Sequence, residues 1–248
     1  NQAISLVKNL MGLGDNYHVI FVGGGASTQF AHIPLNFLTE DKVAAYVDTG
    51  IWSTKAIREA QNLGKVHLAA SSKDGGYTYV PMGNEIDCPN DAAYLHLTSN
   101  NTIKGTQYHE FPDSGSVPLI CDMSSDILSH QVDFNQLAMF YAGAQKNLGP
   151  SGVTLVVLRD DMLGRINNGL PTIFDYRTHA EKKSLFNTPP SFTIYVVKLI
   201  LEWIQGQGGL KAVEDNNRKK KDVIYNLIDA NPDYFRADLP AHVACFRR

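Results

Sequence analysis

The chain has 248 residues, with 22 basic and 25 acidic side chains and a formal net charge of -3. This balance excludes a strongly basic nucleic-acid-binding protein and a polyacidic tail, so no nucleic-acid partner is expected. With 44% apolar and 10% aromatic residues, the chain can bury a large core, which excludes disorder along its whole length. Its apolar runs are far shorter than the roughly 20 residues of a membrane-spanning helix, so no membrane partner is expected.

Three cysteines, Cys88, Cys121 and Cys245, lie far apart in the sequence. They are too few for a disulfide framework, and their spacing does not form a CxxC metal knuckle. We therefore expect no metal site, and we expect a reducing compartment, with the cytoplasm as the default location.

The predicted elements alternate between short apolar runs and longer helical patterns. Residues 1–10 are predicted to belong to an amphipathic helix, so the chain is expected to begin inside a structured region. Helices are also predicted over 27–38 and 53–63, and from about Pro189 to the glycines at 206–209. Strands are predicted at 18–22, 43–47, 93–97, 117–121, 139–142 and 154–158. This alternation predicts an α/β fold whose mainly parallel, mixed sheet has helices on both faces.

The last predicted helices suggest a division of the chain. An apolar stripe at spacings of three and four is expected to pack on the sheet; its members are Phe192, Tyr195, Val196, Leu199, Ile200, Trp203 and Ile204. The basic run Arg218-Lys-Lys-Lys221 is expected to be a solvated helix face. We predict a large α/β domain over residues 1–210, followed over 211–248 by a connecting helix and the start of a small domain.

A glycine turn provides the first candidate site. Gly23-Gly-Gly25 follows a predicted strand and precedes a predicted helix, so backbone N–H groups at Ala26 and Ser27 are available to an anion. A tight turn without a ligand is the alternative. A dinucleotide site is another, because Gly23-x-Gly25-x-x-Thr28 resembles GxGxxG and Asp48 lies at a ribose-binding distance along the chain. Thr28 in place of the third glycine weakens the dinucleotide interpretation.

Two ionisable residues follow predicted strands further along. Asp122 comes directly after a buried strand, at the end where α/β folds bind ligands, although it also fits a capping or loop residue. Lys146 interrupts a segment of small and apolar residues. Partial desolvation there would lower its pKa and make the amine nucleophilic. A snorkelling or ion-paired lysine is the alternative.

These signals together favour pyridoxal phosphate as the cofactor. The cofactor needs a phosphate cradle, a carboxylate for its ring nitrogen and a lysine amine for its aldehyde. Ala26-Ser27, Asp122 and Lys146 supply the three in turn. Trp52 offers a flat surface against the ring, with a plain core position as the alternative.

Six motifs in order resemble those of the phosphoserine aminotransferase family, within the class V aminotransferases of pyridoxal-phosphate fold type I. The resemblance covers nearly all of residues 1–236. The motifs are Gly-Gly-Gly-Ala-Ser-Thr-Gln-Phe followed by Ile33-Pro-Leu-Asn36, Asp48-Thr-Gly-Ile-Trp52, Asn100-Asn-Thr-Ile-Lys-Gly105, Cys121-Asp-Met-Ser-Ser125, Ala142-Gly-Ala-Gln-Lys-Asn147 and Phe186-Asn-Thr-Pro-Pro190.

The resemblance implies a set of cofactor contacts. It implies that Trp52 stacks on the ring, that Thr102 and Asp122 contact the ring hydroxyl and ring nitrogen, and that the catalytic Lys146 forms the Schiff base. The full set of implied cofactor-binding residues is Ala26, Ser27, Trp52, Thr102, Asp122, Gln145, Lys146, Asn187 and Thr188.

The resemblance also implies a homodimer and a reaction. Asn187 and Thr188 are implied to reach the partner subunit's cofactor, and Thr188 before Pro189 is predicted to cap the helix that follows. The implied reaction transfers the amino group of glutamate to phosphohydroxypyruvate, giving phosphoserine and 2-oxoglutarate.

Parts of the family pattern have no counterpart in the chain. The family's N-terminal His-Arg pair and the arginine of its small C-terminal domain, which bind substrate, are expected to be missing, and the small domain largely absent. The sequence from Ala237 to Arg248 departs from the family, and Ala26-Ser27 stands where some members have Gly-Arg. Another class V activity (alanine–glyoxylate transamination or cysteine desulfuration), an inactive cofactor-binding dimer and an NAD-dependent oxidoreductase stay open as alternatives.

Overall fold

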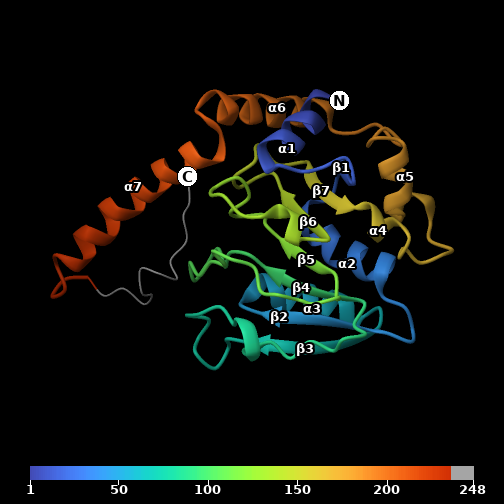
Figure 1. The fold of residues 1–248 in the computed structure, drawn as a ribbon, viewed down its shortest axis with the longest axis horizontal. Coiled ribbons are helices and arrows are strands. Elements are labelled where there is room, and N and C mark those ends of the chain that lie inside the picture. The colour runs from blue at the N-terminus through green and yellow to red at the C-terminus, as the bar shows by residue number, and fades with distance from the viewer. Residues whose placement is uncertain (236–248) are drawn as a thin grey trace.

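A single mixed sheet organises the computed structural model, which describes residues 1–235 (Figure 1). Its strands are β1 (Tyr17–Val22), β2 (Val43–Asp48), β3 (Lys65–Ser71), β4 (Tyr94–Thr98), β5 (Leu119–Asp122), β6 (Met139–Gly143) and β7 (Thr154–Arg159). They lie in the order β1-β7-β6-β5-β4-β2-β3. The pairs from β6 through β3 are parallel, and β7 is antiparallel to both of its neighbours. The predicted mainly parallel, mixed sheet is confirmed.

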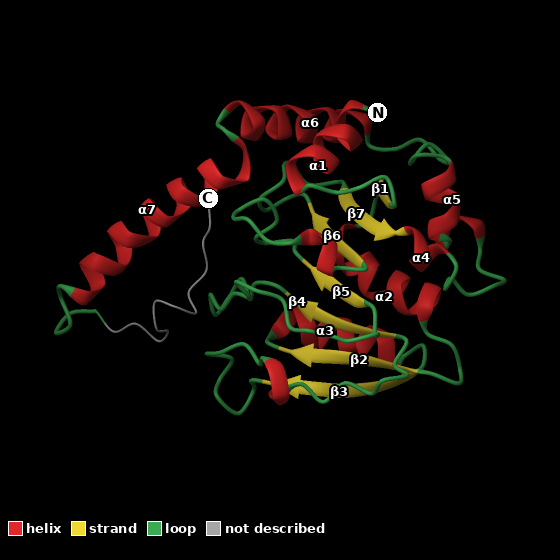
Figure 2. Cartoon of the chain, viewed as in Figure 1, coloured by secondary structure: helices red, strands yellow, loops and turns green. Residues whose placement is uncertain are grey.

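Helices cover both faces of the sheet, as the sequence predicts (Figure 2). They are α1 (Gln2–Met11), α2 (Gly25–Phe37), α3 (Ile51–Gln61), α4 (Asp160–Leu163), α5 (Tyr176–Glu181), α6 (Ser191–Gly206) and α7 (Gly209–Asp229), with 3-10 turns at Gly83–Glu85, Phe134–Gln136 and Thr172–Phe174. Residues of α1 and α6 share one core cluster with Val19 and Phe21 of β1, whereas α2 and α3 share the other with Ile20 and Val22. Because alternate residues of β1 are buried on opposite faces, the strand is apolar from Val19 to Val22.

The strand β3 is absent from the sequence-based prediction. It lies at the end of the sheet, where it pairs with β2 alone, and Leu68 on it is 53% exposed. An edge strand of this kind mixes polar and apolar residues, because only part of it faces the core. Its sequence therefore lacks the continuous apolar run that marks the central strands.

The prediction for the buried face of α6 is wrong in part. Phe192 is 78% exposed and Trp203 is 51% exposed, whereas Val197 and Leu201 are fully buried together with Ile204. Apolar residues lie on both sides of this helix, and only the narrow side toward α1 and the core is covered. Helical spacing alone cannot tell which of two apolar sides is buried.

The helix α7 begins at the expected domain division. It starts at Gly209 after Gly208, and its first turns still contact the main body: Val213 is in the core, and the Asn217 side-chain amide donates to the Ser129 carbonyl at 2.9 Å. Beyond Asn217 the helix projects away from the sheet (Figure 1). A separate small domain over 211–248 stays a prediction, and the atypical sequence from Ala237 lies outside the described residues. None of the helices within 1–235 has the length and apolar character needed to cross a membrane.

Candidate active site

The topology gathers the sequence motifs at one edge of the sheet. The strands β2, β4, β5 and β6 run in the same direction, and β1 shares it because two antiparallel pairings, through β7, separate β1 from β6. The strand β3 also runs in this direction, because it pairs in parallel with β2, so the carboxyl ends of six strands meet at one edge, where α/β folds bind ligands. The strand ends and following segments there carry Ala26, Ser27, Trp52, Thr102, Asp122, Gln145 and Lys146.

The amine of Lys146 joins three of these segments. It donates a hydrogen bond to the Thr102 hydroxyl oxygen at 2.7 Å and lies 4.8 Å from the centroid of the Trp52 ring. The expected partial burial of Lys146 is wrong for this chain, because the turn after β6 buries Ala144 and Leu148 and leaves Lys146 exposed. The lysine is thus positioned by contacts with its neighbours and stays open to a ligand.

Asp122 is buried at the end of β5 and held by Ser124. One carboxylate oxygen, Oδ1, accepts hydrogen bonds from the Ser124 backbone amide at 2.9 Å and the Ser124 hydroxyl at 2.6 Å. The same hydroxyl oxygen accepts from the Gly143 amide of β6 at 3.1 Å. Burial raises the pKa of Asp122, while the bonds from Ser124 and the charge of Lys146 oppose this shift. The carboxylate is thus fixed in orientation and interacts electrostatically with the charge of Lys146.

The turn after β1 offers free backbone donors. Gly24 adopts a left-handed conformation with φ 94°, and α2 begins at Gly25 without a side-chain cap. The first-turn N–H groups, including those of Ala26 and Ser27, are therefore available to an anion, and the helix dipole favours negative charge there. Ala26 and Ser27 share the sheet edge with Lys146.

The turn that carries Trp52 is organised by Asp48. The Asp48 carboxylate accepts hydrogen bonds from the hydroxyls of Ser53 at 2.9 Å, Thr54 at 3.1 Å and Tyr77 at 3.1 Å. These bonds occupy both carboxylate oxygens inside the turn, which argues against the ribose-binding role of Asp48 in the dinucleotide alternative. This organising role depends on Tyr77, 29 positions away, and no local pattern predicts it.

Asn101 joins the Trp52 turn to the Thr102 loop, a role missed at the sequence level. Its side-chain amide donates to the Thr49 carbonyl at 2.6 Å, and its oxygen accepts from the backbone amides of Ile103 and Lys104. A Cβ atom at Gly50 would meet the Asn101 amide nitrogen at 2.3 Å, so only glycine fits there. The repeated asparagine in the motif at 100–105 was the available signal.

A cavity of about 530 Å³ opens beside the lysine. Thr102 and Lys146 contribute polar groups to its lining, and Val196 and Ile200 of α6 contribute apolar ones. Its volume lies within the range of small-molecule sites in proteins. Of the predicted site residues, only Thr102 and Lys146 line it; the others lie around the same edge.

Three further predicted residues lie on exposed segments. Gln145 folds its side chain over Gly143, where a Cβ atom would meet the glutamine oxygen at 2.6 Å. Asn187 and Thr188 are exposed between α5 and α6, and Asn187 lines a second cavity, of about 270 Å³, together with Gly23 and Gly24. The capping role predicted for Thr188 is wrong: α6 begins at Ser191 with Pro190 at the N-cap, because two prolines in succession delay the first helical turn.

A comparison with protein-family models identifies the wider group. The model of the aminotransferase class-V family matches residues 1–245. The chain belongs to the class V aminotransferase family. The resemblance inferred from the motifs is confirmed, and so is the fold type that it implies.

Individual relatives of this class V aminotransferase are phosphoserine aminotransferases. The enzyme of Geobacillus kaustophilus is 53% identical over 230 residues, which are 93% of this chain and 64% of that protein. The phosphoserine aminotransferase structure from Bacillus circulans subsp. alkalophilus matches with a TM-score of 0.96 and 50% identity, over 99% of this chain and 68% of that one. The pyridoxal-phosphate-bound phosphoserine aminotransferase of Trichomonas vaginalis matches with a TM-score of 0.87 and 36% identity, over 96% and 67%. The chain therefore spans about two thirds of the length of these relatives.

Proposed function

We propose that this chain is the cofactor-binding part of a phosphoserine aminotransferase. The reaction is the transfer of an amino group from L-glutamate to 3-phosphohydroxypyruvate, giving O-phospho-L-serine and 2-oxoglutarate. The observation that carries the proposal is the Lys146 amine, which contacts the Thr102 hydroxyl and the Trp52 ring and whose charge acts on the buried Asp122. The 53% identity to a phosphoserine aminotransferase supports the choice of substrates.

The chemical groups of the site fit pyridoxal phosphate. When bound, pyridoxal phosphate supplies an aldehyde that takes up the amino group and a ring that withdraws electrons from the reacting carbon. The free amides at Ala26 and Ser27 suit its phosphate, and the flat face of Trp52 suits its ring. Thr102 and Asp122 offer a hydroxyl and a carboxylate to the polar atoms of the ring, and Gln145 lies on the turn beside Lys146.

Asp122 and Lys146 divide the proton chemistry in this proposal. An ionised Asp122 stabilises a protonated ring nitrogen, and its orientation is set by the two hydrogen bonds from Ser124. The Lys146 amine would take a proton from the substrate α-carbon and return it at the carbon that carried the cofactor aldehyde, acting as base and then as acid. Its position against Thr102 keeps the Nζ atom near the sheet edge during both steps.

A homodimer completes the proposed site. Asn187 and Thr188 are exposed, and the residues before them, Leu185 and Phe186, are 70% and 42% exposed. Adjacent exposed apolar side chains are typical of an interface. Because Asn187 lies beside Gly23 and Gly24 of its own chain, a two-fold axis near this edge would bring Asn187 and Thr188 toward the phosphate-binding turn of the partner.

The alternative of cysteine desulfuration has less support. That reaction needs an exposed, mobile thiol of low pKa. Burial raises the pKa of Cys88, and Cys121 is fully buried with a pKa well above the ordinary value for the same reason. Cys245 lies outside the described residues. The described thiols therefore favour transamination.

Absorption spectroscopy tests the cofactor assignment. Adding pyridoxal phosphate to the wild-type chain is expected to produce a visible band that is absent from Lys146→Ala. Lys55→Ala is a matched control, because the Lys55 amine also lies 4.8 Å from the Trp52 ring centroid but belongs to α3 and not to the turn after β6. A band that survives in Lys146→Ala, or one lost equally in Lys55→Ala, would contradict the assignment.

A half-reaction separates the possible substrates. Phosphoserine added to the pyridoxal-phosphate-loaded chain is expected to bleach the visible band, and alanine at the same concentration is not. Bleaching by alanine alone would favour alanine–glyoxylate transamination. A band that neither amino acid changes would favour a cofactor-binding protein without turnover.

A further inference from the structure

The loop that carries Thr102 returns alongside the strand it leaves. After β4, Ser99 and Asn100 lead into the loop, and residues 106–108 lead out of it. The Tyr108 amide donates to the Ser99 carbonyl and the Asn101 amide to the Thr106 carbonyl, each at 2.8 Å, so the two arms pair for only a few residues. So short a pairing is marginal by itself and needs support from the protein around it.

The carboxylate of Asp126 contacts both arms of this loop. Oδ1 accepts a hydrogen bond from the Ser99 hydroxyl at 2.5 Å, and Oδ2 accepts one from the Gln107 side-chain amide at 2.9 Å. All three residues are essentially inaccessible to solvent. One charged group thus ties the entry of the loop to its exit.

The same short segment also carries the predicted partner of the ring nitrogen. Asp126 lies four residues after Asp122, and its backbone amide donates to the Met123 carbonyl at 3.2 Å. The Ser99 amide in turn donates to the Asp122 carbonyl at 3.0 Å. The Asp126 carboxylate therefore links the segment of Asp122 to the loop of Thr102, and both of those residues act on Lys146.

A buried carboxylate is costly unless its oxygens are hydrogen-bonded. Burial raises the pKa of Asp126, and His130, Ser99 and Gln107 oppose this shift. An apolar residue would fill the position without this cost, but it would not fix the directions of two polar partners. The chemistry of the group thus favours a role in setting geometry.

We propose that Asp126 is a positioning residue, which holds the Thr102 loop in register with Asp122 through its bonds to Ser99 and Gln107. The consequence for the cofactor rests on the proposed function. The role of Asp126 in the loop geometry does not rest on the proposed function. The loop geometry and the cofactor binding are therefore tested by separate measurements.

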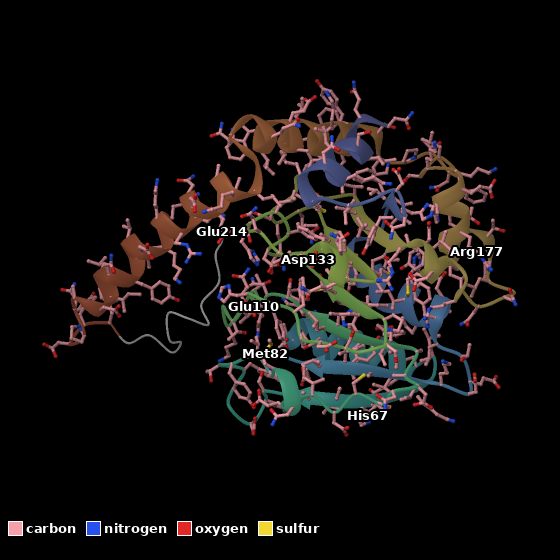
Figure 3. All side chains as sticks on the ribbon, viewed as in Figure 1. His67, Met82, Glu110, Asp133, Arg177 and Glu214 are labelled. Carbon is pink, nitrogen blue, oxygen red and sulfur yellow. The ribbon has the colours of Figure 1, made fainter. Side chains whose placement is uncertain are left out.

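Asp126→Asn is the first test variant. It keeps the acceptor for Ser99 but places a donor opposite the Gln107 amide. Amide hydrogen exchange of residues 100–108, measured without cofactor, is expected to speed up by at least about 10-fold, and the affinity for pyridoxal phosphate is expected to fall by about 10-fold, as for the loss of one buried hydrogen bond to a charged group. Asp133→Asn is the matched control, because Asp133 is exposed and its hydrogen bonds within residues 1–235 stay in its own turn (Figure 3).

The double variant Asp126→Asn with Gln107→Glu restores the pairing with donor and acceptor exchanged. It is expected to recover the slow exchange and at least half of the lost binding free energy, which a purely space-filling role would not allow. Ser99→Ala releases only the other arm and is expected to speed up exchange even where Asp126→Asn fails to fold.

Three outcomes decide the proposal. The proposal is overturned if the amide hydrogen exchange of residues 100–108 is unchanged in both Asp126→Asn and Ser99→Ala. It is also overturned if these amides exchange as fast in the double variant Asp126→Asn with Gln107→Glu as in Asp126→Asn alone. If the wild-type chain does not bind pyridoxal phosphate, the proposed function fails, and the exchange of residues 100–108 alone decides the role of Asp126.

Discussion

The Lys146 amine donates a hydrogen bond to the Thr102 hydroxyl oxygen at 2.7 Å, across 44 positions of the chain. The two residues belong to segments after β6 and β4, strands that are separated in the sheet by β5. This bond directs the amine toward the strand that carries Asp122. It is the contact that most directly joins the separate motifs into one site.

Replacing Thr102 by valine keeps the shape of the side chain and removes the acceptor. Thr102→Val is expected to weaken the binding of pyridoxal phosphate by about 10-fold. The Thr102 hydroxyl accepts a hydrogen bond from the charged Lys146 amine, and a hydrogen bond to a charged group contributes about 1.5 to 3 kcal/mol. Titration with pyridoxal phosphate, monitored by absorbance, measures the affinity. Thr78→Val removes a hydroxyl in an exposed turn and serves as the control; equal affinities for the two variants would show that Thr102 has no role in the site.

Asp122→Asn is expected to separate stability from function. Burial raises the pKa of Asp122 in the folded state, so the stability that this group contributes is present below its unfolded pKa and is lost as the pH rises through its folded pKa. At neutral pH the charge therefore lowers stability, and the variant is expected to melt at the same or a higher temperature. Its half-reaction with phosphoserine is expected to slow by up to about 100-fold.

Ser124→Ala is expected to change the melting temperature in the opposite direction to Asp122→Asn. It removes the hydroxyl donor but keeps the backbone donor to Asp122. The ionised carboxylate then loses a bond that stabilises it, and the melting temperature at neutral pH is expected to fall. Melting curves between pH 5 and pH 8 measure both variants, and a fall for Asp122→Asn as large as that for Ser124→Ala would contradict the reasoning.

The buried His32 is expected to make the fold less stable in acid. Burial, and to a lesser extent the neighbouring His179, lower the pKa of His32 from 6.5 to about 4. A group with a depressed folded pKa contributes stability above its unfolded pKa that is lost as the pH falls toward the folded one. The free energy of unfolding is expected to fall by up to about 3 kcal/mol between pH 6.5 and pH 4 on account of His32.

Urea unfolding at several pH values measures this contribution. His32→Leu is expected to unfold with a shallower dependence on pH than the wild type in this range. The comparison variant is His67→Leu on the edge strand β3, which removes a half-buried histidine outside the core clusters (Figure 3). Parallel curves for wild type and His32→Leu would contradict the prediction.

Gly24 is expected to tolerate no side chain in the turn that we propose to bind phosphate. Its φ of 94° disfavours other residues by about 1 kcal/mol or more, and a Cβ atom there would meet the Thr28 hydroxyl oxygen at 2.0 Å. Gly24→Ala is expected to destabilise the fold by about 2 to 4 kcal/mol. Adding Thr28→Ala relieves the clash and is expected to recover part of this loss, whereas Gly23→Ala, with open space around its Cβ position, is expected to cost less than about 1 kcal/mol. Chemical denaturation compares the three.

The fold was largely predictable from local sequence patterns. Central strands such as β4 and β6 are buried on both faces, and burial of that kind favours runs that are nearly continuous in apolar residues. The edge strand β3 and the buried side of α6 were not predictable, because each depends on which neighbouring element covers it. Both sides of α6 are apolar, and the packing of this helix near α1 buries Val197 and leaves Phe192 exposed.

The site was predictable only in its principal groups. Asp122 and Lys146 stand out because a charge at the end of an apolar segment has few structural reasons to be there. Asp48 was noticed only as a candidate ribose ligand and as part of a family motif, and Asp126 was not noticed at all, although each organises a loop. Their partners, Tyr77 and Gln107, come from other parts of the chain, and only the folded structure brings them together.

The pairing of β1 with β7 has a consequence for the order of assembly during synthesis. Tyr17 pairs with Arg159 and Val22 with Thr154, so β1 finds its neighbour only after about 140 further residues have been made. The glycine turn that follows β1 has no fixed support before that moment. The phosphate site proposed for this turn is therefore expected to form late, and closing so long a loop places this step among the slow ones of folding.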